Sequence, residues 1–343
     1  MTKDIIFFDS TLRDGSHAIG HKLTVDNIRN YCTGIDGSGL HVVIVGHGNG
    51  LGASSLQIGL SALPDQEMLT TARKALKKTK LGAFLIPGLG TIKDNLAPAI
   101  DLGVDLVCVA CHCTEADVTG QHIDYVRKRG KDVYGVLMMC HMAAKEKLLM
   151  EAKKMQSYGA LGVILMDSAG AFDPNMLEET VSFLSKKLDI PVGFHGHNNL
   201  GLAVSNSLTA IRSGAKIIDG TIRGFGAGAG NCQLEVFIGL LSRMKIETGV
   251  DLYKLMDVSD GVVAKIMHKA QEIDSVSLTS GMAGVFSGFA PYVKKAAERF
   301  SVDPRDIFIA LGKRKIVGGQ EDFIIDVALE IANKKAKDQN LSF

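Results

Sequence analysis

Two histidines, His195 and His197, stand two positions apart in the segment VGFHGHNN. Side chains at this spacing on a β-strand project from the same face, so both imidazoles would point to one place. A carboxylate suited to join them occurs near the start of the sequence, where Asp14 follows Arg13 in DSTLRDGSH. Imidazole and carboxylate groups are common ligands of divalent metals. The three residues predict a metal site; the alternative is a pair of buried, hydrogen-bonded histidines.

Arg13 and His17 flank the predicted ligand Asp14. The Arg13 guanidinium would place a fixed positive charge beside an oxygen that gains negative charge during a reaction. The His17 imidazole is a candidate general base, because the ordinary pKa of histidine lies near neutrality. The alternatives are a salt bridge between Arg13 and Asp9 and a position for His17 on a surface loop.

Two more polar residues are candidates for the same site. Ser168, in MDSAGA, can donate a hydrogen bond to a substrate carboxylate or can cap a helix. Asn231, which ends the glycine run GFGAGAGN, can supply another oxygen ligand or orient the ligands through hydrogen bonds. Such ligands suit Mn2+, Co2+ or Zn2+, and sites with hard oxygen ligands also hold Mg2+.

Eight short apolar runs alternate with longer segments of helical character. The runs comprise residues 5–9, 42–46, 82–88, 106–111, 133–139, 162–167, 192–197 and 217–222. Continuous apolar strands separated by helices indicate a parallel sheet covered on its outer face, and eight such units predict a (β/α)8 TIM barrel. In that fold the chemistry lies at the carboxyl ends of the strands, where all the candidate residues fall.

The alternating pattern stops near residue 265, and helical stretches follow. We therefore predict a TIM-barrel catalytic domain over residues 1–265. Residues 266–343 are predicted to form a C-terminal helical appendage that serves as a lid or docks a partner. The whole chain is accordingly placed in the α/β class.

The composition excludes several classes of protein. A net charge of +1 gives no broad electrostatic reason to bind nucleic acid or an anionic membrane, and no apolar stretch is long enough to cross a bilayer. Six cysteines in 343 residues form no disulfide framework, and we expect reduced thiols, no signal peptide and a cytoplasmic location.

Two local patterns point to other sites, but weakly. The run Cys111-His112-Cys113 lacks the second cysteine pair of a structural zinc site. The pattern G-x-G-x-x-A that starts at Gly48 follows the second strand and has no helix directly after it, as a dinucleotide site would require.

Taken in order, several motifs resemble those of one family, the 4-hydroxy-2-oxovalerate aldolases. These are class II, metal-dependent pyruvate aldolases of the DRE-TIM metallolyase superfamily, and the resemblance covers nearly the whole chain. The motifs are STLRDGSH, HCTEADV, LMMCHM, MDSAGA, FHGHNNLGLAVSNS, GFGAGAGN and GGQEDFIIDVALE.

The resemblance implies a role for each candidate residue. Asp14, His195 and His197 would hold Mn2+ or a similar ion that binds the substrate. His17 would remove the proton of the C4 hydroxyl, and the C3–C4 bond would break to release an aldehyde. Arg13 would stabilise the pyruvate enolate, and Ser168 would contact the substrate carboxylate.

The resemblance also implies a cellular setting. Members of the family pair with an acylating acetaldehyde dehydrogenase, which receives the aldehyde. We therefore expect such a partner, an oligomeric assembly and a role in the breakdown of aromatic hydrocarbons.

One position departs from the family pattern. The family has a tyrosine in a segment such as AGVYSSF, whereas this chain has Phe286 in the corresponding segment AGVFSGF. The phenylalanine keeps the shape of the ring but loses a hydrogen bond of about 1 kcal/mol. Tyr292 lies six residues later and could replace the lost hydroxyl only in a reshaped lid. The departure bears on the choice of substrate and on stereocontrol at C4.

Two other functions compete with the aldolase. The first is a Claisen-type acyl transferase or lyase of the same superfamily; the related isopropylmalate synthases and hydroxymethylglutaryl-CoA lyases typically have RDG-x-Q, whereas this chain has His17 in that place. The second is a weakly active subunit that binds a partner, which Phe286 would suggest. The apolar residues Ile86 and Leu89 favour a substrate with an alkyl end.

Overall fold

A computed structural model of the chain describes residues 5–340 and contains a closed barrel of parallel strands. Each strand pairs with the next in sequence order, and the last pairs with the first. The strands are β1 (Ile6–Asp9), β2 (Val42–Ile44), β3 (Lys80–Leu85), β4 (Leu106–His112), β5 (Asp132–Met138), β6 (Val163–Asp167), β7 (Val192–Gly196) and β8 (Ile217–Gly220). The predicted (β/α)8 barrel is confirmed.

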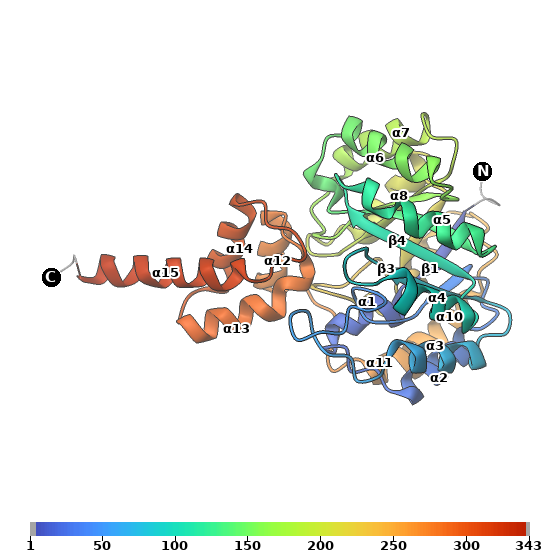
Figure 1. Ribbon diagram of the computed structural model, residues 1–343, viewed down its shortest axis with the longest axis horizontal. Coiled ribbons are helices and arrows are strands. Elements are labelled where there is room, and N and C mark those ends of the chain that lie inside the picture. Colours follow the sequence, from blue (N-terminus) through green and yellow to red (C-terminus); the bar gives the residue numbers. More distant parts are fainter. Residues whose placement is uncertain (1–4, 341–343) are drawn as a thin grey trace.

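Helices surround the barrel, and α1 lies at the end that carries the candidate site (Figure 1). They are α1 (Thr11–Ala18), α2 (Val25–Ile35), α3 (Asp65–Ala75), α4 (Ala97–Asp101), α5 (Gly120–Lys128), α6 (Lys145–Ser157), α7 (Pro174–Ser185), α8 (Ala203–Arg212), α9 (Leu234–Arg243), α10 (Leu252–Val258) and α11 (Ala264–Ile266). Short 3₁₀ or π turns are η1 (Ile92–Leu96), η2 (Ala116–Thr119), η3 (Cys140–Met142), η4 (Ile222–Gly224), η5 (Ser259–Val263) and η6 (Ser287–Phe289). Among the described residues, each helix is too short or too polar to cross a membrane.

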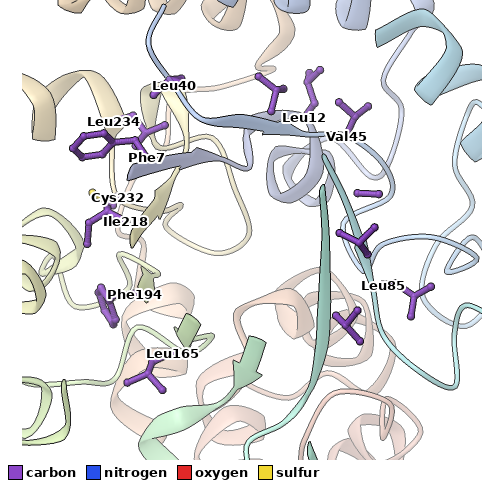
Figure 2. Packing of buried hydrophobic residues seen from close by; sticks show 14 of the residues in the cluster. Phe7, Leu12, Leu40, Val45, Leu85, Leu165, Phe194, Ile218, Cys232 and Leu234 are labelled. Carbon is purple, nitrogen blue, oxygen red and sulfur yellow. The ribbon is translucent and has the colours of Figure 1, made fainter. Parts of the chain in front are cut away.

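The strands are apolar on both faces because the sheet separates two layers of core. Side chains such as Phe8, Tyr134 and Ile164 pack together in one buried group, and Ile217 belongs to it. Alternate residues belong to the layer between strands and helices, part of which Figure 2 shows around Phe7, Phe194 and Ile218. Alternation along β8 therefore sets Asp219 on the same face as Ile217.

The C-terminal helices form a separate bundle beside the barrel (Figure 1). Its helices are α12 (Ser275–Ala283), α13 (Ala290–Phe300), α14 (Pro304–Lys313) and α15 (Phe323–Asn340). The bundle has its own core, in which Val285, Phe289, Phe308 and Leu311 are buried. It can hold its shape while one of its turns contacts the barrel.

Three strands, β2, β3 and β8, end two or more residues before their predicted apolar runs do. The predicted run 42–46 gives a strand that stops at Ile44, because Gly46 has a φ of 151° and leaves the extended conformation. The run 82–88 gives a strand over Lys80–Leu85, because Pro87 has no N–H to offer the sheet. The freed residues extend from the barrel end that carries the candidate site.

Replacing Gly15 with alanine should lower stability by about 1–3 kcal/mol through overpacking. Gly15 lies in α1, and an added Cβ would come 2.2 Å from the Phe225 ring. Gly239→Ala in α9 is the matched control, since its Cβ would meet only Leu252, at 4.0 Å. Thermal unfolding of both variants checks this; equal melting temperatures would contradict it.

Candidate active site

Asp14, His195 and His197 converge at the carboxyl ends of the strands. Each offers one ligand atom, and these atoms all lie within 4.8 Å of one another. His195 belongs to β7, His197 follows it, and Asp14 lies in α1, directly after β1. All three are buried, and no second group of this kind occurs within residues 5–340. The structure therefore brings together the three ligands that the sequence predicts.

Several buried polar atoms near this point have no hydrogen-bond partner, and two of them can offer a lone pair to a metal. His195 Nδ1 lies 2.9 Å from the Asp219 carboxylate, which also accepts a hydrogen bond from Ser10 Oγ at 2.8 Å. His195 Nε2 and Asn231 Oδ1 have no protein partner. A carboxylate behind one imidazole nitrogen leaves the other as a lone-pair donor, as in metal sites. The donor set fits a divalent metal.

Asp14 is ionised because cationic and N–H groups surround it. Burial alone would raise the pKa of its carboxyl, but Arg13 and the three nearby histidines hold this pKa well below its usual range. Arg13 Nη1 lies 2.9 Å from Asp14 Oδ1, and Asn231 Nδ2 donates to Asp14 Oδ2 at 2.6 Å. Ala227 N also donates to Oδ2, at 3.2 Å. The carboxylate is thus fixed in its charged, ligating form.

Arg13 lies at the cavity and does not pair with Asp9. Its Nη1 donates to the Gly48 carbonyl at 3.2 Å, and its guanidinium lies 4.6 Å above the centre of the Phe84 ring. Asp9 instead accepts hydrogen bonds from Thr11 and Tyr31. The alternative of an Arg13–Asp9 salt bridge is therefore wrong.

His17 lines the same cavity as Arg13, Asp14 and His197 and is not an exposed loop residue. Burial lowers its pKa to about 4, although the Asp14 charge opposes this shift. The imidazole is therefore neutral at pH 7 and can accept a proton. Gly48 makes room for it, because a Cβ there would lie 2.4 Å from His17 Nε2. This close approach explains the glycine pattern at residue 48 without a nucleotide.

Ser168 and Phe286 complete the walls of a cavity of about 380 Å3. Ser168 Oγ accepts a hydrogen bond from Met139 N at 3.2 Å, and the cap of the following helix is Asp173. The helix-cap alternative for Ser168 is therefore wrong. The Phe286 ring lies edge-on to His17, with the ring centres 6.3 Å apart.

Apolar side chains line another part of the cavity, and Tyr292 is not among its lining residues. Tyr292 lies on α13, packs against the core of the bundle and lines a neighbouring cavity of about 460 Å3. It does not replace the missing hydroxyl at Phe286. The apolar residues around the site include Ile86, Leu89, Met138 and Met166.

Among residues 5–340, the cysteines near β4 and β5 belong to no group of three metal-ligand side chains. All six cysteines of the chain are buried and free. Burial raises the pKa of Cys111 well above its usual value and that of Cys113 to about 12, so their thiols stay protonated. The free, buried thiols agree with the reduced thiols that the sequence predicts.

Comparisons with known proteins agree with the fold and the motifs. Residues 4–262 match the HMGL-like family, and residues 271–333 match the DmpG-like communication domain. The chain is 52% identical to the 4-hydroxy-2-oxovalerate aldolase of Pectobacterium atrosepticum, over 97% of each chain. It is 51% identical to the enzyme of that name from Spirochaeta aurantia, over 96% of this chain and 97% of that one.

The chain belongs to the 4-hydroxy-2-oxovalerate aldolase family. The predicted family and the predicted enzyme class, a carbon–carbon lyase, are both confirmed.

Solved structures with lower sequence identity share the fold. The carboxyl transferase domain of Rhizobium etli pyruvate carboxylase, in a Y628A variant with pyruvate, aligns with a TM-score of 0.80 at 16% identity. That alignment covers 97% of this chain and 62% of the other. The N-terminal domain of a putative aldolase from Bacteroides vulgatus aligns with a TM-score of 0.71 at 24% identity, over 84% and 96% of the two chains.

Asp219 is the residue of this site that the sequence analysis missed. Replacing it with asparagine should weaken divalent-metal binding about 10–100-fold, because the carboxylate orients the His195 ring and increases its basicity. Mn2+ titration followed by electron paramagnetic resonance measures this affinity. Asp132→Asn is the control, since Asp132 begins β5 at the opposite end of the barrel. Equal affinity in the two variants would contradict the role of Asp219.

Proposed function

We propose that this chain cleaves a 4-hydroxy-2-oxoacid, such as 4-hydroxy-2-oxopentanoate, into pyruvate and an aldehyde and catalyses the reverse addition. One observation carries the proposal: Asp14, His195 and His197 come together as possible metal ligands, and Asp14 and His197 line one cavity with the neutral His17 and with Arg13. A retro-aldol reaction needs a base at the hydroxyl and an electron sink at the ketone. Relatives that bear the aldolase name support the same substrate class.

Asp14, His195 and His197 would hold the metal, with Mn2+ as the first candidate and Co2+, Zn2+ or Mg2+ as the others. A divalent ion at this point supplies a Lewis acid for the 2-oxo and carboxylate oxygens of the substrate. Asn231 fits here because its Nδ2 holds Asp14, while its Oδ1 stays without a protein partner.

The remaining residues bind the substrate and move the proton. Ser168 contacts the substrate carboxylate, and His17 accepts the proton of the C4 hydroxyl. The oxygen then forms the carbonyl of the aldehyde, the C3–C4 bond breaks, and its electron pair passes into the enolate of pyruvate. Arg13 stabilises the negative charge on the enolate oxygen, and protonation at C3 completes pyruvate.

We also propose the division of the chain at residue 265 and a docking role for the helical appendage. The match of residues 271–333 to the communication domain supports an acylating acetaldehyde dehydrogenase as the partner. An oligomeric assembly, a cytoplasmic location and a role in the breakdown of aromatic hydrocarbons remain predictions from the sequence.

The Claisen-type alternative and the partner-binding subunit make different demands on the same protein. An acyl transferase consumes a thioester together with a 2-oxoacid, whereas an aldolase releases pyruvate from the hydroxy-oxoacid alone. A pure binding subunit does neither. Assays for pyruvate release and thioester consumption on one metal-loaded preparation separate the three functions.

His17→Ala should lower kcat for pyruvate release by about 10²–10⁴-fold, the usual contribution of a general base. Mn2+ binding should persist, because His17 is not among the three ligands. In the unaltered enzyme, log kcat/KM should rise with pH as His17 loses its proton and level off above a pKa that lies below the ordinary 6.5. That rising limb should disappear in the variant.

His41→Ala is the control for this experiment. His41 stacks on Phe8, with ring centres 5.6 Å apart, and precedes β2 at the opposite end of the barrel. Full activity in His17→Ala would refute the assignment of the base.

Phe286→Tyr should keep aldolase activity but change the selectivity at C4. With phenylalanine, no phenolic oxygen lies beside His17 to distinguish the two configurations, so the protein should consume both enantiomers of 4-hydroxy-2-oxopentanoate. The tyrosine variant should favour one enantiomer, and Phe286→Leu should remain unselective. Chiral analysis of the residual substrate tests this; strict selectivity in the unaltered protein would contradict it.

A further inference from the structure

We infer that Asn199 and Ser287 are positioning residues. They hold Phe286, which lines the active-site cavity, in place against the barrel. The inference builds on the proposed function, because it concerns how the wall beside His17 is held. Neither residue belongs to the three possible metal ligands or lines the cavity of about 380 Å3; both act through their neighbours, Phe286 and Ser168. The contact joins the helical appendage to the barrel.

Ser287 makes the direct contact between the two parts of the chain. Its backbone N–H and its Oγ both donate to the carbonyl oxygen of Ser168, at 3.0 and 2.8 Å. Ser287 is fully buried, as is the Ser168 side chain. Ser287, in the appendage, thus holds the backbone of Ser168, which lines the cavity on the barrel side. Phe286 directly precedes Ser287 in the sequence.

Asn199 connects Ser287 with two loops of the barrel. Its Nδ2 donates to Ser287 Oγ at 2.8 Å and to Ala169 O, after β6, at 2.9 Å. Its Oδ1 accepts a hydrogen bond from Ala229 N, after β8, at 2.9 Å. Asn199 itself follows β7 and is fully buried. Both amide hydrogens and the amide oxygen are therefore used to join loops that carry site residues to the appendage.

Glycines allow all three neighbouring segments to approach Asn199 closely. A Cβ at Gly228 would lie 2.6 Å from Asn199 Oδ1, and one at Gly170 would lie 2.9 Å from its backbone N. A Cβ at Gly281, in α12, would lie 3.0 Å from Asn199 Cβ. A side chain at any of these three positions would push that position's segment away from Asn199. The close packing around Asn199 therefore depends on glycine at these positions.

A second contact holds the other end of the same turn. His141 Nε2 lies 3.0 Å from Gly284 O, where α12 ends in a left-handed residue. Val285, between the two contacts, is buried in the core of the bundle. The segment 284–287 is therefore fixed at both ends, and the Phe286 ring has a defined place against His17. Loss of the Asn199 contact should free the end that directly follows Phe286.

Hydrogen exchange measured by mass spectrometry on the full chain tests the contact without reference to catalysis. In Asn199→Ala the Ser287 amide should exchange roughly tenfold faster, because its local opening becomes easier. Ser287→Ala removes only the hydroxyl and should raise exchange in residues 284–289 in the same direction. Asn206→Ala is the control: Asn206, in α8, is also buried, but its Nδ2 donates to Phe172 O, at 2.8 Å, and not to the appendage.

Catalysis supplies the second readout. Asn199→Ala should lower kcat/KM for the hydroxy-oxoacid by about tenfold to a hundredfold, because Phe286 would no longer be held in place beside His17. The affinity for Mn2+ should stay unchanged. Unchanged exchange at 284–289 in both variants, or equal losses in Asn199→Ala and Asn206→Ala, would overturn the inference. A protein that releases no pyruvate would refute the proposed function instead, and the exchange data would still decide whether the contact exists.

Discussion

The buried carboxylate of Asp14 is the group on which the rest of the site depends. A charge at this depth is stable only if cationic or N–H groups surround it. Arg13, the Asn231 amide and the Ala227 N–H supply those partners, and together they hold the carboxyl ionised. The same partners fix its orientation toward His195 and His197, so charge stabilisation and ligand geometry arise from one set of contacts.

Barrel closure is what brings these partners together. Asp14 follows the first strand, and Asn231 and Ala227 follow the last; β1 and β8 lie side by side because the sheet closes on itself. The glycine run before Asn231 lets the backbone pass close to the carboxylate, since a Cβ at Gly226 would lie 2.4 Å from Asp14 Oδ2. In an open sheet, the Asp14 carboxylate would lack the hydrogen bonds from Ala227 N and Asn231 Nδ2.

Much of this site could be predicted from the sequence, because period-two spacing and apolar runs are local signals. His195, His197 and Asp14 stand at strand ends, and the fold rule for such ends places them together. Asp219 shows a limit of this reasoning. Asp219 lies two residues after the inward-facing Ile217, which is a signal for its direction, but its place within an apolar run hides its role.

Asn199 and Ser287 show a different limit. Their importance comes from hydrogen bonds across 88 positions of the sequence, and an asparagine after a strand looks like any loop residue. Phe286 was recognised as unusual only through the family resemblance. Its place beside His17 depends on how the appendage meets the barrel, which no local pattern specifies.

Anomalous X-ray diffraction from crystals of the chelator-stripped protein soaked in Mn2+ would locate the metal directly. We expect one strong anomalous peak among Asp14, His195 and His197, which Asp14→Asn should weaken or abolish. A peak elsewhere, or none at this position in a protein that releases pyruvate, would contradict the assignment of these three residues as the metal site.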